Sequence, residues 1–232
     1  MSFIQEVKHS LQFAQQQEGW RAALHMSTKF LTMPFFEHHK GYLLRKALNK
    51  PIIIPPPKIN VTIRKATEGD LALFETAVPR IRAKRFIKKL QAGEVCFVAI
   101  WESAMVGFVW AGFADSPSTK SAGLELDPTE AYLWAGYAPP RYRSQGIVRT
   151  VNLTLIRWLQ KQGYQRVVLL VEQDNAASLK HCYRMGYRLE SQITYRRLLK
   201  WKRVQFPPVN VTILGQTSEV PQTSEASPQA II

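Results

Sequence analysis

The sequence predicts a mixed α/β (α+β) fold: a central, mostly antiparallel twisted sheet with one parallel βαβ crossover, preceded by a helical N-terminal extension. Residues 94–114 hold two aromatic and β-branched runs joined by a short polar turn, which is typical of an antiparallel hairpin. Residues 131–171 have the pattern strand, helix, strand, and the closing run RVVLLV favours a buried central strand. The stretch PIIIPPP at 51–57 separates this region from the residues before it.

The first 50 residues are expected to be helical. Apolar residues recur with loose helical spacing over residues 2–33, with a break near Gly19, and a second, basic helix is predicted over residues 35–48. The prolines that follow forbid a helix or a central strand, so residues 51–58 are predicted to be an extended linker. The predicted organisation is therefore an extension at 1–50, a linker at 51–58, a domain at 59–204, and a tail at 205–232.

Within the domain, the expected element order is β-α-β-β-β-α-β-α-β. VTIRKAT begins it as an alternating strand, and one or two helices interrupted at Pro79 follow over residues 68–93. After the hairpin, residues 114–130 form a polar loop long enough to shape a binding site. The crossover, a short helix from residue 176 and a strand over residues 193–204 complete the domain. The Pro/Ser/Thr/Gln-rich tail is predicted to be disordered.

Composition excludes several classes of protein. The two cysteines, Cys96 and Cys182, lack the spacing of a metal site or a disulfide framework, and a reducing cytoplasm fits them. His38 and His39 are adjacent, so they do not share a helix face, and no metal site is expected. No apolar run reaches the 18 or so residues that span a bilayer, and the N-terminus lacks the order of a signal peptide, so a soluble, cytoplasmic protein is predicted.

The chain is strongly basic. Its formal net charge is +14 and its pI is about 10.0. Such a surface can serve nucleic acid, an anionic membrane surface or acidic small ligands, or it can be solvated with no partner. Net charge alone does not choose among these.

The turn before the crossover helix is a candidate anion site. Arg141, Arg143 and Arg149 surround the start of the helix, where unpaired N–H groups and the helix dipole favour a phosphate. Gly146 lets the backbone approach a ligand closely. A glycine at a helix start with solvated arginines is the plainer interpretation of the same residues.

Over about residues 59–204 the sequence resembles the GNAT superfamily of acetyl-CoA-dependent N-acetyltransferases. That family places Arg/Gln-x-x-Gly-x-Gly/Ala at this turn, and the sequence has Arg143 to Val148 there, with the β-branched Val148 departing from the small residue. The resemblance implies acetyl-CoA as co-substrate, no metal, and direct attack of a primary amine on the thioester. It implies that backbone groups of Gly136, Tyr137 and Ala138 pair with the pantetheine arm. The pyrophosphate would be held by Arg143, Ser144, Gln145, Gly146, Ile147, Val148 and Arg149.

The helix NAASLKHCYRMGY at 175–187 matches the family at Asn175 and Ser178, both predicted cofactor-site residues, and at the Gly-aromatic exit. The family's Tyr, which protonates the departing thiolate, falls on Cys182 in this frame. Helical geometry agrees, because Asn175, Ser178 and Cys182 lie within about 40° of one another and Tyr183 lies about 100° from Cys182. Cys182 can be a general acid or a packed residue; as a nucleophile it lacks a facing base. If Cys182 is packed, water or Tyr183 in a changed register supplies the proton.

Glu130, at the start of the crossover strand, is the predicted general base, and Glu125 and Asp127 are the other carboxylates available. The predicted function is N-acetyl transfer to an unidentified amine, an anionic small molecule or a protein amine, and a polycation fits poorly because acids are few. A catalytically impaired module that binds RNA or another acidic partner is the alternative. A third hypothesis makes residues 1–50 a membrane-surface anchor.

Overall fold

The computed structural model describes residues 36–198 and 201–205, with side chains described over residues 40–195 and at Gln205. The helices predicted within residues 1–35, the membrane anchor built on them and the tail at 206–232 lie outside the described residues. No helix in the described part of the chain is long and apolar enough to cross a membrane.

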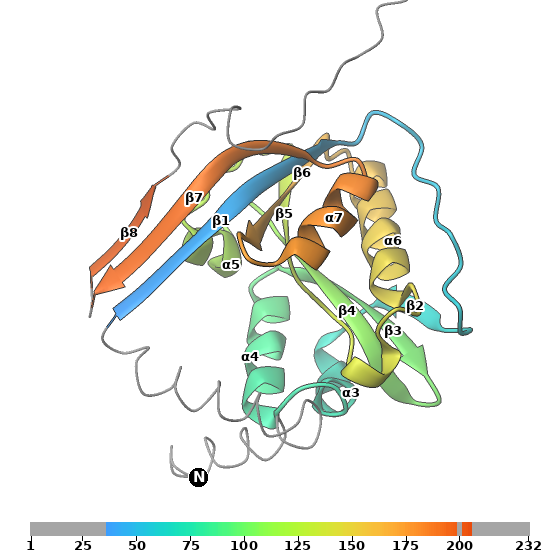
Figure 1. Cartoon of the computed structure of the whole chain (residues 1–232). Coiled ribbons are helices and arrows are strands. Elements are labelled where there is room, and N and C mark those ends of the chain that lie inside the picture. Colours follow the sequence, from blue (N-terminus) through green and yellow to red (C-terminus); the bar gives the residue numbers. More distant parts are fainter. Residues whose placement is uncertain (1–35, 199–200, 206–232) are drawn as a thin grey trace, which may run out of the picture.

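The domain follows the predicted order of elements, with additions at both ends (Figure 1). The strands are β1 (Phe36–Ala47), β2 (Thr62–Lys65), β3 (Val95–Trp101), β4 (Ala104–Gly112), β5 (Glu130–Tyr137), β6 (Arg166–Glu172), β7 (Arg188–Leu198) and β8 (Trp201–Gln205). The helices are η1 (Glu68–Asp70), α3 (Leu71–Glu75), α4 (Arg80–Gln91), α5 (Pro117–Ala122), η2 (Pro140–Tyr142), α6 (Ile147–Lys161) and α7 (Ala176–Arg184). Pro79 stands at the N-cap of α4, so the predicted interruption is confirmed.

The described strands form one eight-stranded sheet in the order β2-β3-β4-β5-β6-β1-β7-β8. β5 and β6 are parallel, and the other neighbouring strands are antiparallel. The α6 helix connects the parallel pair, as the crossover pattern predicted. The predicted sheet, mostly antiparallel with one parallel crossover, is therefore confirmed.

Helices cover both faces of the sheet. Phe97 and Ala99 pack in one core with residues of α6 and α7, whereas Cys96 and Val98 pack in a second core with residues of α3 and α4. Adjacent residues of β3 thus pack in cores on opposite faces of the sheet, because side chains alternate along a strand. This explains why the hairpin strands are apolar at almost every position.

The prediction of a helix over residues 35–48 is wrong. Residues 36–47 form β1, which lies between β6 and β7 and is antiparallel to both (Figure 1). Leu43 and Leu44 are 7% and 0% exposed and belong to cores on opposite faces. A Cβ at Gly41 would lie 2.7 Å from the Val171 backbone oxygen, so glycine permits this close approach. Tertiary pairing has overridden the local helical pattern.

The proline-rich segment does not separate residues 36–50 from the domain, since β1 belongs to the same sheet. It has no helix or strand over residues 51–57, but it is fastened to α6. Arg157 of α6 donates to the Ile52 oxygen at 2.6 Å, and Thr150 donates to the Pro55 oxygen at 3.1 Å. The segment thus runs along α6 and carries the chain from β1, inside the sheet, to β2 at one edge of the sheet.

Two local predictions also need correction. The polar loop at 114–130 contains the short helix α5, which ends at the left-handed Gly123 (φ 70°). The strand predicted over residues 193–204 is a hairpin, because β7 pairs with β8 and Leu198 faces Trp201 in the register. The sheet consequently gains an edge strand after the last predicted element.

Candidate active site

The parallel strands β5 and β6 separate part way along their length. Their pairing runs from Glu130 opposite Arg166 to Leu133 opposite Leu169 and stops there, although both strands continue. The cause lies next to this point: Ala135 has φ 50°, and the register between β4 and β5 shifts between Phe108 and Trp110. Such a β-bulge bends a strand and ends its pairing. The far half of β5 therefore has an edge that β6 does not cover.

The chain leaves β5 through η2 and enters α6 by a tight turn. Ser144 has φ 61°, and Gly146, the N-cap of α6, has φ 80°. Gly146 offers no side-chain cap, so N–H groups in the first turn of this 15-residue helix lack that partner. Such N–H groups at the positive end of the helix dipole form a site for an anion.

A cavity of about 260 Å³ lies where the β5 end meets the α6 start. Eight of the predicted cofactor-site residues line it, together with Tyr142: Gly136, Tyr137, Ala138, Arg143, Ser144, Gly146, Ile147 and Val148. A Cβ at Gly136 would lie 3.4 Å from Val148 Cγ1, so the valine stands directly beside the strand and narrows this cavity. Gln145 and Arg149 do not line this cavity. The backbone carbonyl oxygen of Gln145 accepts a hydrogen bond from the Lys58 backbone N–H at 2.8 Å.

The start of α7 places the other two predicted cofactor residues in a helix cap. The Asn175 Oδ1 accepts a hydrogen bond from the Ser178 N–H at 3.0 Å, which is the role of an N-cap side chain. Neither residue lines the 260 Å³ cavity. The sequence match at these positions therefore has a structural explanation in the helix start.

Cys182 points into the protein and Tyr183 points out, as the helical count predicted. Cys182 is 4% exposed and belongs to the core on the α6 side, whereas Tyr183 is 42% exposed. Burial raises the pKa of Cys182 to about 11, although a hydrogen bond with Ser178 lowers it in part. The neighbouring His181 has its pKa lowered by burial and then by the charges of Arg149 and Arg184. The thiol is thus protonated at neutral pH, and no positive charge among the described residues lowers its pKa.

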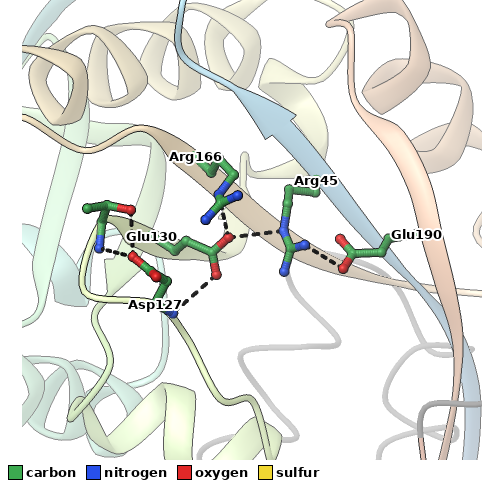
Figure 2. A network of polar contacts seen from close by, with 6 residues as sticks. Arg45, Asp127, Glu130, Arg166 and Glu190 are labelled. Atoms are coloured by element: carbon green, nitrogen blue, oxygen red, sulfur yellow. Dashed lines mark hydrogen bonds and ion pairs between the residues drawn. The ribbon is translucent and has the colours of Figure 1, made fainter.

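Glu130 is not placed as a general base. It lies at the start of β5, at the opposite end of the strand from the separation, and is 3% exposed. Its Oε1 is 3.2 Å from Arg45 Nε and 2.9 Å from Arg166 Nε, and Arg45 also pairs with Glu190 (Figure 2). These residues come from β5, β1, β6 and β7, so the network joins four neighbouring strands. This network gives Glu130 a structural role, and catalysis by Glu130 stays a prediction.

The other two candidate carboxylates lie in the loop before β5. Asp127 accepts from the Thr129 N–H and hydroxyl at 2.9 and 2.6 Å, and its own N–H donates to Glu130 Oε2 at 3.3 Å. Glu125 is exposed. Neither lines a cavity described here, so the structure brings none of the three predicted carboxylates to the strand separation.

A second cavity of about 490 Å³ lies on the opposite face of the sheet, beneath α4 and α5. Its lining is mostly apolar and aromatic, with two lysines and one carboxylate: Lys40, Gly41, Lys89, Ser118, Ser121, Ala122, Tyr132, Trp134, Leu170, Val171, Glu172, Ile193 and Tyr195. Burial, with a smaller contribution from Glu94, raises the pKa of Tyr132 to about 12, so its hydroxyl stays neutral. No sequence motif predicted this cavity, although its α5 residues come from the loop expected to shape a binding site.

One wall of this cavity is fixed by a buried acid. Glu94, 2% exposed, accepts from the Ser118 N–H and hydroxyl, both at 2.8 Å, and so anchors the first turn of α5. Lys89 donates to the Ser118 hydroxyl at 2.6 Å, lies 3.6 Å from Glu94, and sits 4.6 Å from the centroid of the Trp134 ring. The position of the Lys89 ammonium is therefore set by three partners.

No group of three or more potential metal ligands occurs among the described residues.

Residues 65–187, just over half of the chain, match the model of the acetyltransferase (GNAT) family, and the chain belongs to that family. The resemblance inferred from the two motifs is thereby confirmed.

The chain is similar to several solved structures. A GCN5-related N-acetyltransferase from Sphaerobacter thermophilus is 13% identical with a TM-score of 0.53, over 81% of this chain and 59% of that one. An N-acetyltransferase from Staphylococcus aureus Mu50 is 22% identical with a TM-score of 0.41, over 55% of this chain and 83% of that one. The aminoglycoside N-acetyltransferase AAC(6')-Iy, solved with CoA, is 20% identical with a TM-score of 0.45, over 55% and 91% of the two chains. No curated protein matches this sequence.

Proposed function

We propose that this protein is an N-acetyltransferase that moves an acetyl group from acetyl-CoA to a primary amine while both are bound. One observation supports this most directly. The two cavities border the same uncovered part of β5 from opposite faces of the sheet, the smaller at Gly136 to Ala138 and the larger at Trp134. A thioester held in the separation of β5 and β6 would be within reach of an amine in the larger cavity. Positioning of this kind supplies a large part of the rate enhancement in direct transfer.

The residues of the smaller cavity fit acetyl-CoA. Backbone groups of Gly136, Tyr137 and Ala138 would pair with the pantetheine arm, since β6 does not cover this stretch. The first turn of α6 would hold the pyrophosphate through its N–H groups, with Arg143 in the cavity wall. When bound, acetyl-CoA supplies an activated acyl group, and a backbone N–H of the uncovered β5 edge would polarise its carbonyl.

The proton for the departing sulfur has two candidate sources, Cys182 and water. A pKa of about 11 keeps the Cys182 thiol protonated but makes it a weaker acid than an exposed cysteine. Tyr183 is the poorer candidate because it faces outward. Both cysteines, Cys96 and Cys182, are free, which fits a protein of the reducing cytoplasm.

Thermal unfolding with and without acetyl-CoA tests the proposal. A ligand at about 100 times its Kd stabilises the folded state by about 2.7 kcal/mol, which for a domain of this size raises Tm by roughly 5–10 °C. Gly136→Val would fill the cavity from the strand side and should abolish the shift. Gly69→Val is the matched control, because a Cβ there meets only Thr67 Oγ1, at 3.8 Å. The proposal fails if acetyl-CoA gives no more stabilisation than adenosine diphosphate and salt.

The surface of α4 favours a second candidate function, binding of RNA. The helix carries six Lys or Arg and no acid, and Lys84, Arg85 and Lys88 are exposed. Phosphate contacts through such residues weaken steeply with salt. Changing these three residues to Glu should remove RNA binding at 50 mM salt and leave the acetyl-CoA shift intact. RNA binding that survives the changes would exclude this surface.

A further inference from the structure

The 490 Å³ cavity has the size and lining of a site for a small amine with an apolar body. Its volume lies within the range of about 300–1,000 Å³ that is usual for small-molecule sites. Leu170 and Ile193 contribute apolar surface, while Tyr132, Trp134 and Tyr195 contribute aromatic surface. Aromatic faces and edges accommodate a ring or an alkyl chain better than a polyhydroxylated body.

The charges in the lining are asymmetric. Glu172 is the single carboxylate that lines this cavity among the described residues, and Lys40 and Lys89 are the cations. Lys89 cannot move away easily, because Ser118 and Glu94 hold its ammonium beside the Trp134 ring. One ammonium group therefore finds one anionic partner here, and a second ammonium on the same molecule would face fixed positive charge.

Glu172 stands at the reacting end of the cavity. It is the last residue of β6, three positions after Leu169, where the pairing with β5 stops. Strand alternation places it on the same face as Leu170, toward the cavity. Its register partner on β1 is Gly41, which also lines the cavity. The carboxylate is thus beside the gap in which the thioester would lie.

Resting on the proposed function, we propose that the acceptor is a primary amine with a single positive charge and an apolar or aromatic body, and that Glu172 receives its ammonium. Transfer forms a C–N bond to the acetyl carbon and breaks the thioester C–S bond. Of the three ammonium protons, one goes to the Glu172 carboxylate, one goes to the leaving sulfur, and one stays on the amide nitrogen. Glu172 then returns its proton to water.

Binding of paired amines to the CoA-loaded protein tests this without any turnover. The probes are 2-phenylethylamine, its analogue with a para-aminomethyl group, and kanamycin, each titrated by calorimetry. We expect 2-phenylethylamine to bind at least tenfold more tightly than the diamine and kanamycin. Equal or tighter binding of either polycation would overturn the proposal.

Two variants tie the selectivity to the residues. Glu172→Gln should weaken 2-phenylethylamine binding about tenfold, and it should lower kcat for acetyl transfer to this amine, because the carboxylate that receives the ammonium proton is removed. Glu125→Gln, which changes an exposed acid outside the cavity, should change neither. Lys40→Gln should raise affinity for the diamine severalfold. Unchanged binding by the Glu172 variant, or an unchanged diamine affinity in the Lys40 variant, would count against the proposal.

The outcome separates this proposal from the proposed function. If acetyl-CoA stabilises the protein but Glu172→Gln binds 2-phenylethylamine normally, the acceptor assignment is wrong and the transferase assignment stands. If acetyl-CoA does not stabilise the protein, the transferase assignment itself is wrong.

Discussion

Replacing Glu130 by Gln distinguishes a structural residue from a catalytic one. The substitution keeps the shape of the side chain and removes a charge that is 4% exposed and lies 3.2 and 2.9 Å from the Nε atoms of Arg45 and Arg166. Both Nε atoms are buried but make no well-directed hydrogen bond among the described residues, so the attraction is mainly coulombic. The arginine side chains are 31% and 44% exposed, which reduces the loss below the 3–5 kcal/mol typical of a fully buried pair. We expect a loss of about 2 kcal/mol in the free energy of unfolding.

The assay is thermal and urea unfolding of the Glu130→Gln protein, followed by acetyl-CoA titration. A loss of about 2 kcal/mol corresponds to a fall in Tm of roughly 4–8 °C for a domain of this size. The stabilisation by acetyl-CoA should be unchanged. Glu190→Gln is the control. Glu190 is 36% exposed and, among the residues that the structure describes, contacts the network through Arg45 alone, so the substitution should cost less than about 1 kcal/mol. A Glu130→Gln protein with an unchanged Tm and no activity would refute the structural role.

Three further predictions follow from individual residues. Native Cys182, with its pKa of about 11, should react with iodoacetamide at pH 8 roughly 200-fold more slowly than in the unfolded chain. Rapid labelling of the Cys182 peptide, measured by mass spectrometry, would contradict its burial. The Cys182→Ala variant should keep acetyl transfer within about threefold of wild type. The guanidinium of Arg64 lowers the pKa of Asp70 to about 2, so this pair stabilises the fold above the unfolded pKa of about 4 and loses that effect as pH falls through about 2. The unfolding free energy of Asp70→Asn, measured in urea, should therefore be lower than wild type by roughly 1–2 kcal/mol at pH 7 and nearly equal near pH 2, and a constant gap would exclude the linkage. Ala135→Val should lower the free energy of unfolding by about 2 kcal/mol, whereas Ala135→Gly should leave it unchanged or raise it, because φ is 50° at this position. A higher Tm for the Val variant than for the Gly variant would be inconsistent with the bulge.

The hairpin and the crossover were predictable because their signals are local. Val95–Trp101 and Ala104–Gly112 are rich in residues that fit a pleated surface, and a short turn fixes their pairing. The α6 turn was likewise marked by Gly146 and its arginines. The hairpin, the crossover and the α6 turn could all be predicted because each depends on residues that are close together in the sequence.

The strand β1 was not predictable from local pattern. Leu43 and Leu44 are both buried because strands and helices cover both sides of β1, and consecutive apolar residues suit a helix as well as a doubly buried strand. Its partners, β6 and β7, are more than 100 residues away in the sequence. Only Gly41, whose missing Cβ permits the close approach to Val171, hinted at a strand.

The prediction of Glu130 as the general base did not take the direction of the strands into account, although the sequence indicates that direction. In a parallel crossover, ligands bind beyond the carboxyl ends of the strands. Glu130 opens β5 and Glu172 closes β6, so only Glu172 lies at the end where the strands separate. The sequence RVVLLVE places an acid directly after a buried strand, and this was the available signal.

The two ends of β5 therefore carry different tasks, and the first supports the second. At its start, Glu130 holds four strands together, including the inserted β1. At its far end, the bulge at Ala135 lies where β5 stops pairing with β6. A sheet keeps such a gap only if its strands are fixed elsewhere, because an unpaired strand edge is a template for pairing with another strand. Weakening the Glu130 network should thus loosen the 490 Å³ cavity, which β1 and β6 line, before it affects the turn at the start of α6, because α6 packs against β4.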